Sequence, residues 1–254
     1  MKNRAIRLSA ALFVLLLAIG CGEPEEATST NSELPNDSQT TDIPEASTVQ
    51  ESDDSWVCRP KGAGPFPAVL YSHGGLGTAI GGDLKGTCEA LAEAGFLARS
   101  EKRPETTSLS GHLNEVLSGL ALLRGHADAD VNHVGIMGFS RGGLLTLQAA
   151  IQEESSVQAV VLMAPAHGNG QLSDSINDVS SIAAPVEIYV SENDLTQADH
   201  VQLAHDVDDA LRAAGKPVNL TVYPPYGSDG HMLFDQVQEP YWSDVLAFLE
   251  NQLK

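Results

Sequence analysis

Short apolar runs alternate with amphipathic stretches along most of the chain after about residue 56. The runs FPAVLYS, HVGIMGF, VQAVVLM and PVEIYV are nearly continuous in apolar residues, whereas the stretches between them repeat apolar residues at helical spacing. The first pattern is typical of strands buried on both faces, and the second of helices that cover a sheet. We therefore predict one α/β domain over residues 56–254, with a mostly parallel sheet covered by helices on both faces.

The first 21 residues follow a different pattern. Three basic residues precede the apolar run LSAALFVLLLAIG, which is shorter than a membrane-spanning helix, and Cys21 follows directly. This arrangement resembles a bacterial lipoprotein signal, in which the cysteine is lipidated, although Ala18 stands where such signals usually carry leucine. An ordinary secretory signal cleaved nearby is the alternative. In either case we expect export, and lipidation of Cys21 would hold the protein at the periplasmic face of a membrane or at the cell surface.

Residues 22–55 are acidic and poor in large apolar side chains. They contain ten acidic residues and no basic one, so little apolar surface is available to offset the entropy cost of ordering them. We expect a disordered tether here. Its acidity contributes to a formal net charge of −20, which argues against nucleic acid or anionic lipid surfaces as partners. The lipid anchor would be the only contact with a membrane.

The remaining cysteines, Cys58 and Cys88, form an even pair. In an exported chain such a pair is a candidate disulfide, and two buried free thiols are the alternative. No cysteine or histidine spacing matches a metal site, since His200 and His205 lie five positions apart and would face different sides of a helix. The sequence predicts neither a metal nor a cofactor.

The motif GFSRGG contains a candidate nucleophile, Ser140. It follows a predicted strand and precedes a predicted helix, at the edge of the sheet where functional residues gather. A tight packing turn is one explanation. The other is a nucleophile elbow, in which a strained turn lifts the hydroxyl clear of the backbone. Gly138 and Gly142 fit an elbow, because side chains at these positions would collide with neighbouring backbone.

A serine hydroxyl becomes a good nucleophile when a base takes its proton and an acid orients that base. In elbow enzymes the acid and then the histidine follow the serine along the chain, each after a later strand. Asp194 ends the stretch PVEIYVSEND, and His231 follows the last predicted strand. Glu192 and Asp229 are competing acids, but Glu192 lies earlier in the strand exit, and Asp229 is only two residues from His231, a cramped geometry for bonding its ring.

Acyl transfer also needs backbone donors aimed at the oxyanion. Arg141 supplies one N–H at the start of the helix, and the second should come from the stretch SHGGLG, where Gly75 is our first choice and Leu76 the second. We expect His73 to brace this loop rather than to transfer a proton. We expect the Arg141 side chain to be a solvated charge beside the site rather than a contact for an acidic substrate.

The motifs HGG, GFSRGG, SEND and YPPYGSDGH, in this order and spacing, resemble the α/β-hydrolase superfamily. GPFPAVLYSHGG and the YPPYG ending are most similar to dienelactone-hydrolase-like serine hydrolases. The resemblance covers about residues 56–254 and implies an α/β-hydrolase fold, a Ser140–Asp194–His231 triad and an oxyanion hole at Arg141 and Gly75. Dienelactone hydrolases carry cysteine at the nucleophile position, and this departure argues against dienelactone itself as the substrate.

The predicted reaction is therefore the hydrolysis of a small-molecule carboxylic ester without a cofactor. Only about 18 mostly polar residues connect VVLMAPA with PVEIYV, too few for a lid domain, so we expect an open site suited to short acyl esters. A serine peptidase or amidase with the same triad is one alternative. A surface-binding protein that keeps the fold without turnover is another, because fold alone does not prove activity.

Overall fold

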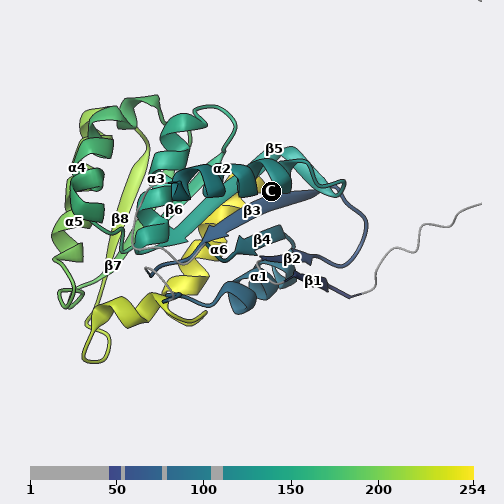
Figure 1. Cartoon of the computed structure of the whole chain (residues 1–254), viewed down its shortest axis with the longest axis horizontal. Coiled ribbons are helices and arrows are strands. Elements are labelled where there is room, and N and C mark those ends of the chain that lie inside the picture. The colour runs from purple at the N-terminus through teal and green to yellow at the C-terminus, as the bar shows by residue number, and fades with distance from the viewer. Residues whose placement is uncertain (1–45, 53–54, 76–78, 104–110) are drawn as a thin grey trace, which may run out of the picture. The chain divides into compact units, whose positions relative to one another are not determined.

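One eight-stranded sheet forms the centre of the molecule, with strand order β1-β2-β4-β3-β5-β6-β7-β8 (Figure 1). The computed structural model describes residues 46–52, 55–75, 79–103 and 111–254. β2 is antiparallel to both of its neighbours, and all other pairs are parallel. The strands are β1 Thr48–Ser52, β2 Ser55–Arg59, β3 Phe66–Ser72, β4 Leu97–Glu101, β5 Ala129–Phe139, β6 Ala159–Met163, β7 Val186–Ser191 and β8 Val218–Tyr223.

Helices cover both faces of this sheet, with α1 and α6 on one face and α2, α3 and α5 on the other (Figure 1). The central strands are apolar on both sides, and all five residues of β6 are buried. This arrangement confirms the predicted α/β-hydrolase fold class. The helices are α1 Leu84–Glu93, α2 His112–Arg124, α3 Arg141–Gln152, α4 Gln171–Ser175, α5 His200–Ala213 and α6 Tyr241–Leu253.

Three short helices form the connection between β6 and β7, where many hydrolases of this fold carry a lid. They are the 3-10 helix Gly168–Gly170, α4, and the 3-10 helix Ile176–Ser181. This connection therefore contains no separate lid domain. Within the described ranges, no helix combines the length and the apolar character needed to cross a membrane.

The sheet begins earlier in the chain than the sequence pattern predicts. β1 lies inside the segment expected to be a disordered tether, and β2 begins at Ser55. All five side chains of β1 are exposed, so this strand is held by backbone pairing to β2, with Thr48 opposite Arg59. The predicted disorder was therefore wrong for Thr48–Ser52 and for Ser55. The predicted signal and residues 22–45 of the predicted tether lie outside the described residues.

A disulfide joins β2 to α1. Cys58 and Cys88 are both fully buried, and their sulfur atoms are 2.08 Å apart. Of the two alternatives that the sequence leaves open for this pair, the structure therefore contains the disulfide. The bond fastens the antiparallel edge of the sheet to the helix that packs beneath it.

Candidate active site

Ser140 occupies a sharp turn between the carboxyl end of β5 and the first residue of α3. Its backbone has φ 53° and ψ −116°, a conformation that costs a residue with a side chain about 1–3 kcal/mol. Three backbone hydrogen bonds hold it there. The Ser140 N–H donates to the Met163 carbonyl (2.8 Å), and the Ser140 carbonyl accepts the N–H groups of Leu144 (3.1 Å) and Ala166 (3.0 Å). The strain is therefore fixed by neighbouring elements on both sides of the turn.

Two glycines make this turn possible. A Cβ atom at Gly138 would lie within 3.0 Å of the Gly142 backbone, and one at Gly142 would overlap the carbonyl groups of Ser72 and His73. The end of β3 and the start of α3 thus approach each other so closely that only hydrogen fits between them. This contact places the hydroxyl of Ser140 beside the loop that follows β3.

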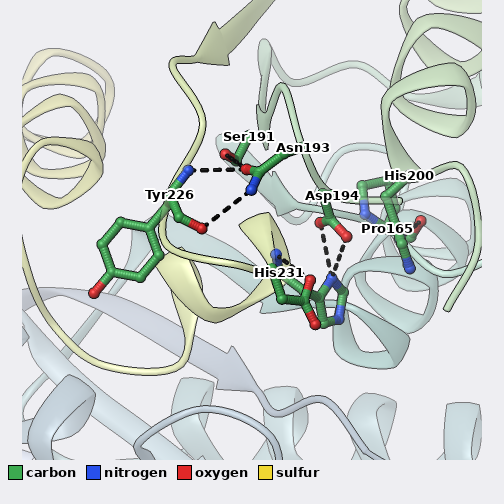
Figure 2. A network of polar contacts seen from close by, with 8 residues as sticks. Pro165, Ser191, Asn193, Asp194, His200, Tyr226 and His231 are labelled. Atoms are coloured by element: carbon green, nitrogen blue, oxygen red, sulfur yellow. Dashed lines mark hydrogen bonds and ion pairs between the residues drawn. The ribbon is translucent and has the colours of Figure 1, made fainter. Parts of the chain in front are cut away.

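His231 and Asp194 form a buried hydrogen-bonded pair (Figure 2). The Nδ1 atom of His231 lies 3.0 Å and 2.8 Å from the two carboxylate oxygens of Asp194, and the side chains are 7% and 1% exposed. Because a carboxylate only accepts, Nδ1 carries the proton and the lone pair of the ring lies on Nε2. Asp194 follows β7 and His231 lies in the 3-10 helix Gly230–Phe234 after β8, the placements that the sequence predicts.

The two competing acids have other positions. Asp229 caps the short helix and accepts the backbone N–H of His231 (3.1 Å), and Glu192 is exposed. Asp194 is thus the one of the three acids that bonds the imidazole ring.

Ser140 and His231 line a common cavity of about 510 Å³. This volume lies within the usual range for small-molecule sites. The cavity therefore brings together the turn after β5, the loop after β3 and the short helix after β8. Its other lining residues are Gly75, Ala79, Ile80, Gly81, Phe139, Arg141, Ala166, His167, Gly168, Asn169, Gln197, Ala198, His200, Met232 and Asp235.

Both described candidates for the oxyanion hole border this cavity. Arg141 is the first residue of α3, where backbone N–H groups have no acceptor within the helix and the helix dipole favours negative charge. Gly75 has φ +84°, and a Cβ atom there would overlap the Ala79 carbonyl, so the loop requires glycine at this point. Leu76, the second choice for the other donor, lies outside the described residues.

His73 braces the loop after β3, the role that we expected for it. Its Nε2 accepts the backbone N–H of Arg103 (3.0 Å), so Nδ1 carries the proton and donates to the Gly74 carbonyl. Burial, reinforced by the Arg103 guanidinium, lowers the pKa of His73 to about 3 and keeps the ring neutral. Arg103 also donates to the His73 carbonyl and to Ser72 Oγ (3.2 Å). Sequence reasoning missed Arg103, because nothing in the local pattern marks it.

The Arg141 side chain is buried rather than solvated, which corrects our expectation. Only 3% of the residue is exposed, and its Nη2 donates to Nδ1 of His112 at the start of α2. Burial, together with the Arg141 charge, lowers the pKa of His112 to about 4. The side chain therefore ties α3 to α2 behind the cavity, while the backbone of Arg141 lies at the head of α3.

Asn193 connects the loops that carry the acid and the base (Figure 2). Its Oδ1 accepts the backbone N–H of Tyr226 (2.8 Å) and the hydroxyl of Ser191 (3.0 Å), and its Nδ2 donates to the Tyr226 carbonyl (3.3 Å). The Asn193 carbonyl accepts the N–H of Gly230 (3.3 Å), next to His231. One side chain thus fixes the loop after β8 against the loop after β7.

A second histidine lies against the catalytic candidate. The ring centroids of His200 and His231 are 4.4 Å apart, and the rings are tilted by 40°. The backbone N–H of His200 donates to the Asp194 carbonyl (3.1 Å), and its Nδ1 lies 3.3 Å from the Pro165 carbonyl. Burial lowers the pKa of His200 below its ordinary value. The sequence placed His200 at the start of a helix but gave no signal of this contact.

Comparison with known proteins finds esterases and a peptidase among the chains similar to this one. Esterase EstD from Thermotoga maritima is 27% identical over 207 residues, which cover 76% of this chain but only 45% of that protein. The chain thus spans less than half the length of this curated relative. Among solved structures, an esterase from a study of two Rhizomucor miehei enzymes superposes with a TM-score of 0.61 at 16% identity, covering 83% of this chain and 85% of its own.

An acylaminoacyl peptidase from Pyrococcus horikoshii superposes with a TM-score of 0.62 at 17% identity, covering 82% of this chain and 41% of its own. At these identities the structural likeness establishes the fold alone. The dienelactone hydrolase family model matches residues 105–245, more than half of the chain, including the turn at Ser140 and both partners of the buried pair. The chain therefore belongs to the dienelactone hydrolase family.

Proposed function

We propose that this protein hydrolyses carboxylic esters through an acyl-enzyme on Ser140. The observation that carries the proposal is the joint geometry of three side chains. A serine in a strained elbow shares a cavity with an imidazole whose Nδ1–H is bound by a buried carboxylate. That arrangement leaves His231 with a basic Nε2 and a fixed orientation, the two properties that a general base for serine requires.

In the first step, Ser140 Oγ attacks the acyl carbon while His231 Nε2 takes the hydroxyl proton. The backbone N–H of Arg141 and a second N–H from the loop at Gly75 stabilise the oxyanion. His231 then protonates the alkoxide, which leaves as an alcohol. A water molecule gives a proton to His231 and attacks the acyl carbon, and His231 then returns that proton to Ser140 Oγ as the bond from Oγ to the acyl carbon breaks and the acid leaves. Asp194 stabilises the imidazolium in both steps.

The cavity has apolar lining residues and only short helices between β6 and β7 instead of a lid domain, which favours a short acyl group over a long lipid chain. Ala79, Ala166 and Ala198 are small, and Ile80 and Met232 present partly exposed apolar surface at 41% and 48% exposure. The short helices between β6 and β7 leave the cavity accessible to the ester of a larger molecule. The names of the Thermotoga and Rhizomucor relatives also favour esters, whereas the peptidase with the same fold makes amides the alternative.

We also propose that the protein is exported and anchored by a lipid on Cys21. The basic, apolar and small-residue order before Cys21 supports this location. The disulfide supports it independently, because disulfides persist mainly in oxidising compartments outside the cytoplasm.

A comparison of the full chain with its Ser140→Ala variant tests the proposed reaction. We expect a fluorophosphonate to label the wild type and p-nitrophenyl acetate and butyrate to be hydrolysed, with kcat lower by about 10⁶-fold in the variant. Ser243→Ala is the matched control, because Ser243 is an exposed serine at the start of α6.

Matched p-nitroanilides separate the two reactions that share this triad. If the anilides are turned over faster than the esters, the protein is an amidase and the proposed ester hydrolysis is wrong. A folded wild-type protein that takes no label would mean that the fold serves binding without turnover.

A further inference from the structure

We propose that His200 and His231 form a binding site for a divalent transition-metal ion such as Zn²⁺, and that the bound ion switches the hydrolase off. The binding part of this inference stands without turnover, whereas the inhibitory part rests on the proposed function. The site is reversible and regulatory, and the reaction itself does not pass through it.

Three side chains with potential metal-ligand atoms, Asp194, His200 and His231, lie close to one another (Figure 2). One ligand atom each from Asp194, His200 and His231 lies within 4.8 Å of the other two, and all three residues are buried. His200 and His231 both line the cavity, so an ion entering from solvent reaches them. Zn–N bonds of about 2.0–2.1 Å place two ligand nitrogens about 3.4 Å apart in a tetrahedral site, a separation that falls inside the 4.8 Å spread of these ligand atoms.

Both rings already have the tautomer that a zinc ligand needs. His231 donates its Nδ1–H to Asp194. Nδ1 of His200 faces the Pro165 carbonyl at 3.3 Å, and because a carbonyl only accepts, this nitrogen carries the proton. Each ring therefore has its lone pair on Nε2. Histidines that bind metals usually donate their other N–H to a carboxylate or a backbone carbonyl, and here one ring has each partner.

The ligand chemistry selects the class of ion. Imidazole nitrogen is a preferred ligand of zinc, copper and nickel, whereas Mg²⁺ and Ca²⁺ prefer oxygen. An ion on Nε2 of His231 occupies the lone pair that would accept the Ser140 proton. Binding of the ion and activation of the serine are thus mutually exclusive.

Zn²⁺ titration of the full chain, followed by calorimetry and fluorophosphonate labelling, tests this site. We expect one Zn²⁺ per chain, loss of labelling and ester hydrolysis over the same concentration range, and recovery of both with EDTA. His200→Gln should weaken zinc binding at least about tenfold, with inhibition of each variant measured against its own metal-free rate. His205→Gln is the matched control on α5, because His205 is exposed, and it should bind zinc as the wild type does.

Calorimetry on Ser140→Ala separates this proposal from the proposed function. If the wild type binds zinc but is not labelled and does not hydrolyse esters, the proposed esterase activity is wrong and the proposed zinc site stands. Equal zinc affinity in folded His200→Gln and wild type would overturn the site. If His200→Gln does not fold, Co²⁺ added to the wild type decides the matter. A tetrahedral visible spectrum supports the site, and the spectrum of aqueous Co²⁺ overturns it.

Discussion

At the scale of single residues, Asn193 helps to set the position of the base relative to the acid. Its side chain bonds the Tyr226 backbone at both N–H and carbonyl, across 33 positions of sequence. Without this side chain, the two loops would keep the bonds from Ser191 Oγ to the Pro224 carbonyl (3.1 Å) and from the Gly230 N–H to the Asn193 carbonyl (3.3 Å), but the bonds to Tyr226 would be lost. We therefore infer that Asn193 is a positioning residue for the proposed reaction, on which it acts through His231.

Replacement of Asn193 by alanine should lower kcat for p-nitrophenyl butyrate by about 100-fold, because a shift of about 1 Å in a catalytic group has an effect of this size. KM should change little, since the side chain does not line the cavity. Asn193→Asp, which keeps the acceptor for the Tyr226 N–H, should recover part of the rate. Asn177→Ala is the control at an exposed amide. An unchanged kcat in Asn193→Ala would contradict this role.

His73 links the loop after β3 to the acid stability of the domain. Its folded-state pKa of about 3 lies below the ordinary value of 6.5 in the unfolded chain, so only the unfolded chain binds a proton between these values. The stability from its neutral ring is therefore complete above pH 6.5 and is lost as pH falls towards 3, at up to about 1.4 kcal/mol per pH unit.

Urea unfolding at pH 7, 6 and 5 measures this loss. The free energy of unfolding should fall more steeply with acidification in the wild type than in His73→Gln. The two slopes should differ by up to about 1.4 kcal/mol per pH unit, the value for uptake of one proton on unfolding. We expect the His73→Gln variant to be less stable at every pH. The comparison therefore uses the slope of the free energy of unfolding against pH and not its absolute value. Equal slopes for the two proteins would show that His73 has the same pKa in the folded and the unfolded chain, and would contradict this prediction.

At the scale of elements, the disulfide between β2 and α1 closes a separation of 30 residues. A loop of this size restricts the unfolded chain enough to stabilise the fold by about 3–4 kcal/mol in the chain-entropy description. Reduction of the wild type, or Cys58→Ser combined with Cys88→Ser, should therefore lower the free energy of unfolding by about that amount. The reductant should have no further effect on the double variant. An unfolding curve that is the same before and after reduction, and the same in the double variant, would contradict this prediction.

The sequence predicts those elements whose burial determines the residue types along them. β3, β6, β7 and the second half of β5 are buried and apolar, so their runs were visible, whereas β1 has five exposed side chains and is held mainly by backbone pairing to β2. For a similar reason, some residues of the site could be predicted and others could not. Ser140, Asp194 and His231 follow strands in a fixed order, and the structure places them around one cavity or its wall.

The supporting residues carry no such signal, because their partners are distant in sequence. Arg103 meets His73 across 30 positions, and His200 meets Pro165 across 35. Burial of Arg141 was missed for the same reason, since its partner His112 belongs to a helix 29 positions away. Order along the chain predicts which residues reach the edge of a sheet, but not which side chains pack behind them.

At the scale of the whole molecule, an acidic segment begins directly after Cys21 and joins this cysteine to the folded unit. A lipid on Cys21 would contribute about 0.8 kcal/mol for each buried CH₂ group, and the acidic segment would be repelled by anionic headgroups. Together these effects predict a catalytic domain held at a membrane surface without lying on it.

Expression of the full chain in a bacterial host, with an alkyne-tagged fatty acid in the medium, tests this arrangement. The wild type should carry the tag and partition with membranes, whereas Cys21→Ser should carry none. The tag reports on Cys21 alone, because Cys58 and Cys88 are bound to each other. An exported wild type that is untagged and free of membranes would instead mean that the N-terminus is an ordinary secretory signal and that the acidic segment tethers the domain to nothing.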